Sequence, residues 1–208
     1  MAIILQKEAP VLRAKAKAVP VAEIKSAKIQ KVIASMKEAL KKEYDGVGIA
    51  APQIGESLRI FVVSDMVFKA RRKNAPVKAA EIAAEVGAEI KPAKPLAKDQ
   101  LVYINPEILS TSKDQKSLEE GCLSVRPLFG KVKRASRARI RAYDENGQLF
   151  ERGSSGLLAQ IYQHEVDHLE GVLFIDKAKD IREMPPYVAE DGRHVIEQAL
   201  EDEAQTNE

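Results

Sequence analysis

The sequence contains little cysteine, tryptophan or other aromatic residues, and the scarcity of cysteine excludes some classes of protein. Its 208 residues include one cysteine and no tryptophan, and only 5% of them are aromatic. The single cysteine, Cys122, excludes an intramolecular disulfide and a zinc module built from four cysteines. The 33 basic and 31 acidic residues nearly cancel, so the overall charge indicates neither sequence-specific nucleic-acid binding nor a membrane surface. The composition is otherwise ordinary, so the role of the Cys122 thiol is the question that it leaves open.

The sequence also lacks a membrane or export segment. No stretch approaches the roughly twenty consecutive apolar residues that cross a bilayer. The first residues, MAIILQKE, have neither the basic start nor the apolar centre of a secretory signal. We therefore expect a cytoplasmic protein without a membrane partner. Its composition, 45% hydrophobic and 31% charged, suits a single domain over residues 1–208.

Two amphipathic helices are expected from the spacing of apolar residues. In residues 24–44 they recur at intervals of three and four, with lysines and glutamates between them. A second helix is expected at residues 157–169, and Gly171 is a suitable residue to end it.

Short runs of β-branched and aromatic residues predict strands. Residues 59–65 and 101–105 form two of these runs, and Pro106 is expected to close the second. Residues 138–143 and 148–150 predict a hairpin whose Asn-Gly turn supplies positive φ angles.

Two regions fall outside this pattern of helices and strands. Residues 66–100 are rich in lysine, alanine and proline, and we expect a surface insertion that is partly helical and mildly basic. From about residue 188 the chain becomes an acidic C-terminal tail that ends in small polar residues.

The strongest chemical motif lies on the second predicted helix. His164 and His168 are four residues apart, and at about 100° per residue their side chains lie within roughly 40° of each other. Both can therefore bind one metal ion. Leu157 and Ile161 fall on the same face, while Glu165 is offset to one side, where it can reach a water at the metal. The pattern predicts a metal at the floor of an apolar pocket.

A third metal ligand has to come from elsewhere in the chain. A metzincin would place a histidine where Phe174 stands, so that family is excluded. Glu190 could serve as a thermolysin-like ligand, although it lies in the acidic tail. Cys122 is the better candidate, because the preceding glycine allows close backbone approach and a thiolate with two imidazoles suits Zn(II) or Fe(II).

Residues 46–53, GVGIAAPQ, match the dinucleotide-binding pattern G-x-G-x-x-A by chance, in our interpretation. That fingerprint follows a buried strand, whereas these glycines follow the end of a polar helix. The segment alone fits a turn into a strand and a ligand-facing loop equally well.

Taken together, residues 46–53 (GVGIAAPQ), 120–124 (EGCLS) and 163–168 (QHEVDH) resemble, in order and spacing, the three signature motifs of bacterial peptide deformylases. The likeness extends over most of the chain but not over the insertion or the acidic tail. It implies an α+β fold with mixed, mostly antiparallel β-sheets, arranged as three sheets, around a central metal-binding helix. The N-terminal helix would pack outside.

The resemblance also implies an activity and a set of roles. The family hydrolyses the N-formyl group from the N-terminal formylmethionine of nascent polypeptides and releases formate. The implied metal ligands are Cys122, His164 and His168. Glu165 would be the general acid and base, and Gln53 with the backbone N–H of Leu123 would stabilise the oxyanion.

Substrate and cofactor follow from the same resemblance. Val47, Leu157 and Ile161 match the pocket for the methionine side chain, and Gly48 and Gly121 match positions that hydrogen-bond the substrate backbone. The implied cofactor is one divalent metal ion, natively Fe(II), with zinc, nickel or cobalt able to replace it. The nascent-chain substrate is compatible with transient ribosome association, for which the basic insertion is a candidate contact.

The sequence departs from the family pattern at one point near the second motif. The family commonly continues after the serine with an aliphatic residue and a proline, but here Arg126 stands between Val125 and Pro127. This departure affects the shape of one pocket rim and leaves the chemistry unchanged. The main alternative function is a zinc endopeptidase that uses the His-Glu-x-x-His motif with a different third ligand.

Overall fold

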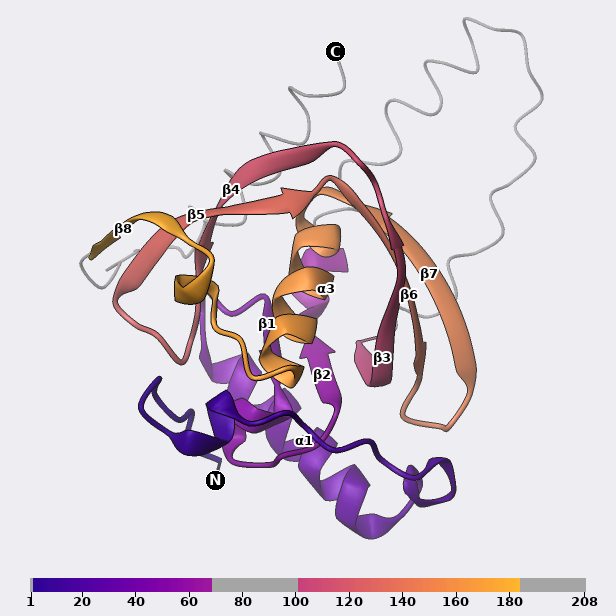
Figure 1. Ribbon diagram of the computed structural model, residues 1–208. Coiled ribbons are helices and arrows are strands. Elements are labelled where there is room, and N and C mark those ends of the chain that lie inside the picture. Colours follow the sequence, from indigo (N-terminus) through magenta and orange to yellow (C-terminus); the bar gives the residue numbers. More distant parts are fainter. Residues whose placement is uncertain (1, 69–100, 184–208) are drawn as a thin grey trace, which may run out of the picture.

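The computed structural model describes residues 2–68 and 101–183, and within them two antiparallel sheets enclose one helix (Figure 1). The helices are α1 (Ala27–Lys42) and α3 (Gly156–Leu169), with short 3₁₀ turns η1 (Pro10–Arg13), η2 (Val21–Glu23), η3 (Ala51–Ile54) and η4 (Phe174–Asp176). The strands are β1 (Gly48–Ala50), β2 (Ile60–Val63), β3 (Val102–Thr111), β4 (Gln115–Gly121), β5 (Leu128–Ala135), β6 (Arg137–Tyr143), β7 (Leu149–Ser155) and β8 (Lys179–Glu183).

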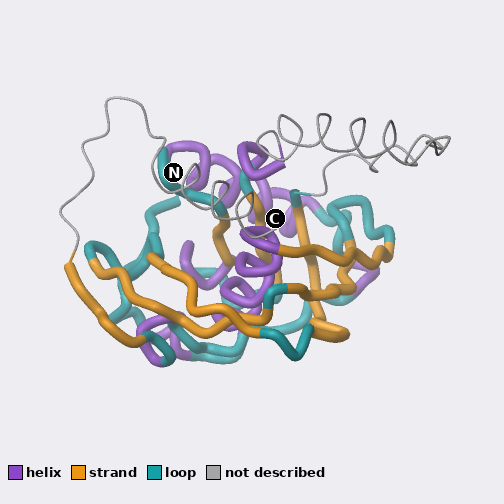
Figure 2. Tube along the Cα trace, turned by 90° about the horizontal axis from the view of Figure 1, so that it is seen from above, coloured by secondary structure: helices purple, strands orange, loops and turns teal. Residues whose placement is uncertain are grey.

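The five-stranded sheet has the order β1-β2-β3-β6-β7, and the three-stranded sheet has the order β4-β5-β8. Every strand pair in these two sheets is antiparallel, and the parallel contact among the described residues is an isolated bridge between Lys17 and Leu58. The α+β class and the central helix are thus confirmed, while the described strands form two sheets rather than three. Viewed from above, α3 lies between the strands (Figure 2).

The two faces of the five-stranded sheet bury different helices. Along β2, Phe61 and Val63 pack in the cluster that contains α3, whereas Ile60 and Val62 pack in the cluster that contains α1. Successive side chains of a strand point to opposite faces of the sheet. Both faces of β2 are buried, and its side chains are therefore apolar at every position. The expected N-terminal helix is therefore present on the face away from α3, and Ser26 caps its start by accepting a hydrogen bond from the Ile29 N–H at 3.3 Å.

Strand β3 is longer than the sequence predicts. Strand β3 continues past Pro106 to Thr111, because the pairing with β6 shifts register between Ile104 and Glu107 and accommodates the proline in a bulge. Asn105 has φ of 50° there, and its side chain bonds both the N–H and the carbonyl of Val19, at 2.8 and 2.7 Å.

The predicted β6–β7 hairpin is confirmed, but its turn is built differently. Gly147 has a positive φ of 75°, whereas Asn146 does not have one. Instead, Asp144 Oδ1 accepts hydrogen bonds from the N–H groups of Asn146 and Gln148, at 2.9 and 2.8 Å. The aspartate side chain therefore closes the turn, as in an Asx turn.

The expected surface insertion begins later than residue 66. Val67 and Phe68 are 2% and 3% exposed and pack in the core cluster around α3, so these two side chains belong to the domain interior. The rest of the insertion, residues 69–100, lies outside the described residues, as does the acidic tail from residue 188.

Helix α3 ends where the sequence predicts, in a Schellman motif. Gly171 has φ of 77°, its N–H bonds the carbonyl of His168, and the N–H of Val172 bonds the carbonyl of Asp167. A Cβ added at Gly171 would lie 2.7 Å from the carbonyl oxygen of Arg13, which belongs to η1. The glycine thus fixes the end of the helix and its contact with the N-terminal segment.

We expect Gly171→Ala to lower the free energy of unfolding by at least about 1–2 kcal/mol, because an alanine is strained at positive φ and meets the η1 backbone. Gly153→Ala is the matched control, since nothing lies within 4 Å of a Cβ at that position. Urea denaturation of both variants measures the difference. Equal stabilities would contradict the proposed role of Gly171.

Candidate metal centre

Three potential metal ligands converge at the C-terminal half of α3. One ligand atom each from Cys122, His164 and His168 lies within 4.8 Å of the others. The Cys122 Sγ is 3.2 Å from the Nε2 of His168, and the two imidazole rings lie 4.9 Å apart. The helix supplies both histidines from successive turns, as the sequence predicts. The cysteine directly follows β4, a strand that was not expected from the sequence.

The protonation of the two histidines suits a metal centre. Burial lowers the pKa of His168 well below its usual range, so this ring is the neutral imidazole that binds metals. Although burial also favours the neutral form of His164, hydrogen bonds to Cys122 and Glu120 raise its pKa well above the usual range. A metal ion bound to His164 would compete with this proton.

A buried ionic network holds His164 in place. Glu120 Oε2 lies 3.0 Å from the Nδ1 of His164, which leaves the Nε2 of that ring for a metal. The same carboxylate accepts two hydrogen bonds from Arg134 at 2.7 and 2.9 Å, and Arg134 also bonds Asp167 on α3 at 2.6 Å. Both Glu120 and Arg134 are only 4% exposed. Burial alone would raise the pKa of Glu120, but the hydrogen bonds from Arg134 and His164 lower it to about 2.

The network continues to the surface on one side. Lys177 Nζ lies 2.7 Å from each carboxylate oxygen of Asp167, which follows Glu165 by two residues on α3. Helix α3, strand β4 and strand β5 are therefore joined by charged hydrogen bonds directly beside the metal ligands.

Glu165 lies in a different environment from Glu120. It is 3% exposed, and its Oε2 has no hydrogen-bond partner among the described residues. Burial raises the pKa of Glu165 to about 7. Its Oε1 lies 2.5 Å from where a Cβ on Gly48 would be, so the glycine in β1 is what makes room for the carboxylate. A carboxyl with this pKa can both accept and donate a proton near neutral pH.

Gln53 is fixed beside the cysteine by its own amide. It lies in η3 and is 1% exposed. Its Oε1 accepts a hydrogen bond from the N–H of Ala50 at 2.7 Å, which directs Nε2 toward Ser124 Oγ at 3.0 Å and Cys122 Sγ at 3.6 Å. Ser124 also donates its backbone N–H to Cys122 Sγ at 3.4 Å. The donor side of the amide therefore faces the ligand cluster.

The segment around Leu123 is held by the N-terminal residues. The carbonyl of Leu123 accepts a hydrogen bond from Gln6 Nε2 at 3.2 Å, and the carbonyl of Gln53 accepts one from the N–H of Leu5 at 2.8 Å. Gly121, just before the cysteine, packs so closely on Phe129 that an added Cβ would lie 2.5 Å from the ring. These contacts fix both segments that were expected to meet at the metal.

The apolar residues predicted beside the metal lie in one core cluster. Ile161 is 3% exposed, and Val47 and Leu157 are partly buried against the same cluster. Phe174, at the position that excluded a metzincin, is 1% exposed and its ring is 6.4 Å from that of His164. Glu190 lies outside the described residues.

Glu120 and Arg134 were not expected from the sequence to have a role in the site. Glu120 was visible as the start of the second motif, but nothing in the sequence identified its partner. A signal for Arg134 does exist, because Gly130, Val132 and Arg134 alternate along β5 with exposed lysines and share the buried face. A charged residue on the buried face of a strand requires a buried partner.

We expect Glu120→Gln to weaken metal binding by roughly 10- to 100-fold and to destabilise the fold by about 3–5 kcal/mol, because Arg134 loses its main counter-charge in the interior. Glu119→Gln is the matched control, since this adjacent carboxylate is exposed and pairs with Arg182 on the surface. Metal titration and urea denaturation measure both effects. A Glu120 variant that behaves like the Glu119 variant would contradict the assigned role.

The fold and the site indicate a class of enzyme: a metallohydrolase in which a cysteine and the two histidines of His-Glu-x-x-His lie close enough together to hold a metal ion. The comparisons with known proteins identify the family. A sequence model of the polypeptide deformylase family matches residues 1–184. The peptide deformylase of Syntrophomonas wolfei is 38% identical over 166 residues, covering 80% of this chain and 87% of the relative.

Solved structures agree with this likeness. The crystal structure of peptide deformylase from Thermotoga maritima superposes with a TM-score of 0.65 at 34% identity, covering 86% of this chain and 98% of that one. A peptide deformylase from Synechococcus elongatus in complex with actinonin gives a TM-score of 0.64 at 27% identity, covering 98% of this chain and 86% of that one.

The chain therefore belongs to the polypeptide deformylase family, whose members are hydrolases that remove the N-formyl group from nascent peptides. The endopeptidase alternative is not favoured. Among the described residues, no helix is long and apolar enough to cross a membrane.

Proposed function

We propose that this chain hydrolyses N-formylmethionyl peptides to formate and a free N-terminal amine, with one divalent metal ion held by Cys122, His164 and His168. The observation that carries this proposal is the convergence of these ligand atoms beside the buried carboxylate of Glu165. A thiolate and two imidazoles bind Zn(II) or Fe(II) and leave room for water and substrate. When bound, the ion lowers the pKa of a water molecule toward neutrality and so supplies the nucleophile.

Glu165 is the proposed general acid and base. With a pKa of about 7, it takes a proton from the attacking water and passes it to the nitrogen of the substrate. One carbon–oxygen bond forms, the formyl carbon–nitrogen bond breaks, and the proton leaves on the amine. Without this transfer, the amine would be too poor a leaving group.

Gln53 and the backbone N–H of Leu123 are the proposed donors to the developing oxyanion. The hydrogen bond from the N–H of Ala50 to Oε1 fixes the orientation of the Gln53 amide, so that its Nε2 faces the ligand cluster before substrate arrives. An oxyanion there would take over one of the hydrogens that Nε2 now donates to Ser124 and Cys122. One such donor is worth about 3 kcal/mol of transition-state stabilisation.

The proposed substrate-binding residues lie on both sides of the cluster. Val47, Leu157 and Ile161 would contact the methionine side chain, and Gly48 and Gly121 would hydrogen-bond the peptide backbone. Support for a peptide substrate comes from a relative: the class I type b peptide deformylase from Acinetobacter baumannii, 29% identical, has a Met-Ala-Ser bound crystal structure with a TM-score of 0.66.

We propose Fe(II) as the native ion on the basis of the family resemblance, because the donor set also suits zinc, nickel and cobalt. We keep the assignment of residues 1–208 to one domain with an insertion and an acidic tail. A nascent-chain substrate also favours a cytoplasmic location and transient ribosome association. Ribosome co-sedimentation of a variant lacking residues 70–98, across a salt series, tests whether the insertion takes part.

The deciding experiment is formate release from formyl-Met-Ala-Ser by the full chain, purified and loaded with iron without oxygen. We expect formate and an equal amount of free Met-Ala-Ser. An endopeptidase would instead cut the peptide internally and leave the formyl group in place. Folded, iron-loaded protein that releases no formate would exclude the proposed function.

A further inference from the structure

Arg126, the residue that departs from the family pattern, lies in a turn that is hydrogen-bonded to the backbone of Cys122. The N–H of Val125 bonds the carbonyl of Cys122, and the N–H of Leu128 bonds the carbonyl of Val125, each at 3.0 Å. Val125 is 1% exposed and packs with Val132 and Phe174 in the core. Its neighbour Arg126 therefore leaves this anchored turn toward the surface, where its side chain is 41% exposed.

The guanidinium of Arg126 forms ion pairs with two carboxylates that lie between α1 and β1. Its Nη1 bonds Glu43 Oε2 at 2.8 Å, and its Nη2 contacts Asp45 Oδ1. Glu43 caps the end of α1, and Asp45 lies in the turn that leads into Gly46. Both carboxylate side chains are 23% exposed, so each is partly covered where it meets the guanidinium.

These ion pairs join the two segments that carry the site. One segment runs from Asp45 through Gly48, which packs on Glu165, to Gln53. The other runs from Cys122 to Arg126. At the metal end the segments are tied by the buried hydrogen bond from Gln53 to Ser124 at 3.0 Å. At the outer end, Arg126 joins the two segments through its ion pairs with Glu43 and Asp45.

We propose that Arg126 is a positioning residue that sets the separation of these two segments and so the affinity for the peptide. The inference rests on the proposed function, in which a formyl-Met peptide lies against Gly48 and Gly121. Two carboxylates on one guanidinium fix both the distance and the orientation, which a single flexible pair does not. The contact acts on binding before the reaction, since it touches neither Glu165 nor a metal ligand.

The expected result for Arg126→Ala is a rise in KM for formyl-Met-Ala-Ser of about fivefold with kcat changed less than about twofold, the signature of lost ground-state positioning. Metal content and thermal stability should match the parent, because exposed ion pairs contribute little to folding. In the parent, raising the salt concentration should move KM toward the value of the variant, since an exposed pair is screened.

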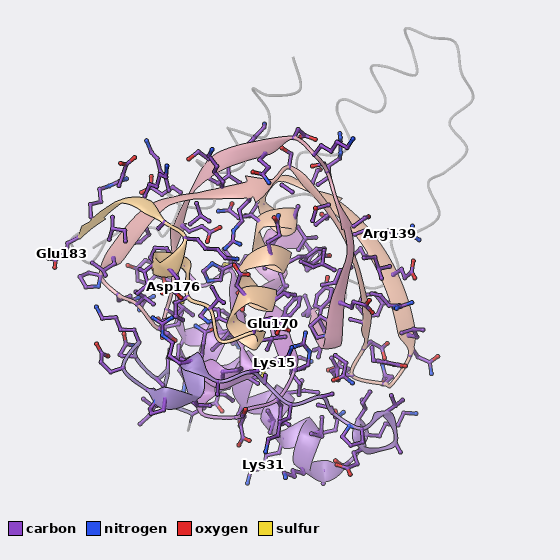
Figure 3. All side chains as sticks on the ribbon, in the orientation of Figure 1. Lys15, Lys31, Arg139, Glu170, Asp176 and Glu183 are labelled. Atoms are coloured by element: carbon purple, nitrogen blue, oxygen red, sulfur yellow. The ribbon has the colours of Figure 1, made fainter. Side chains whose placement is uncertain are left out.

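Arg139→Ala is the matched control. Arg139 is also an exposed arginine in an ion pair, but it joins β6 to Glu151 on β7 in the five-stranded sheet and contacts neither of the two segments that Arg126 connects (Figure 3). Its removal should leave KM unchanged. A general effect of lost surface charge would instead raise KM in both variants.

Charge exchange separates the ion pair from the shape of the arginine side chain. Arg126→Glu places like charges beside Glu43 and Asp45 and should raise KM further than alanine does. Adding Glu43→Arg to that variant should recover part of the loss. Unchanged KM in Arg126→Ala and Arg126→Glu, with an active parent, would overturn this inference and leave the deformylase proposal intact. An inactive, iron-loaded parent would overturn the deformylase proposal itself.

Discussion

Glu165→Gln should reduce kcat/KM for formyl-Met-Ala-Ser by about 10²–10⁴-fold while the protein keeps its metal. Glutamine preserves the size of the side chain in a site where Gly48 leaves room for little else. It cannot accept a proton from water or carry one to the leaving amine. Formate release under substrate-limiting conditions, together with metal content by atomic emission, measures the two outcomes separately.

Glu170→Gln is the control for this experiment. Glu170 follows the last turn of the same helix, but its carboxylate pairs with Arg59 and Lys15. Glu170 and Lys15 are labelled in Figure 3. We expect nearly full activity from it. A Glu165 variant with activity close to that of the Glu170 variant would remove Glu165 from the proposed mechanism.

The parts of the site that could be predicted from the sequence are those set by local geometry. The periodicity of an α-helix alone places His164, His168 and Ile161 on one face. In the structure both histidines lie close to Cys122, and Ile161 packs in the core cluster around α3. The end of α3 was predictable for the same reason, because Gly171 is suited to the left-handed conformation that a Schellman motif needs.

The parts that could not be predicted depend on contacts between distant segments. Glu120 and Arg134 are separated by one hairpin, and Asp167 joins them from α3, so no local pattern pairs the three. The continuation of β3 past Pro106 depends on a bulge that Asn105 stabilises through Val19, 86 residues away. A proline reads locally as the end of a strand, and the tertiary contact decides otherwise.

The assignment of Cys122 depends both on local sequence and on contacts between distant segments. Cys122 lies far from the histidines in the sequence, so no local pattern pairs them, and from the residues alone Glu190 remained open as a third ligand. The resemblance to a family resolved the choice, and the structure places the Cys122 sulfur 3.2 Å from His168. Hydrogen bonds from the N–H of Ser124 and the amide of Gln53 reach the same sulfur, and such contacts orient and tune a thiolate ligand.

Cys122→Ala should therefore lower metal affinity by more than about 100-fold, because loss of a ligand costs more than the 10- to 100-fold effect of an outer partner. Activity should fall with metal occupancy. The cysteine is only partly buried, so the fold should persist and circular dichroism should be unchanged. Titration with Co(II) provides a direct measurement, since the thiolate-to-metal absorption of the parent should be absent in the variant.

Ser124→Ala is the matched control for the cysteine substitution, because it removes a buried hydroxyl two residues away that bonds Gln53 and not the metal. Its backbone N–H still reaches the sulfur, so the thiolate absorption and the metal affinity should remain. If the Cys122 variant instead bound metal as tightly as the Ser124 variant, the third ligand would have to lie elsewhere. The proposed cysteine–histidine–histidine centre would then be wrong, even if formate were still released.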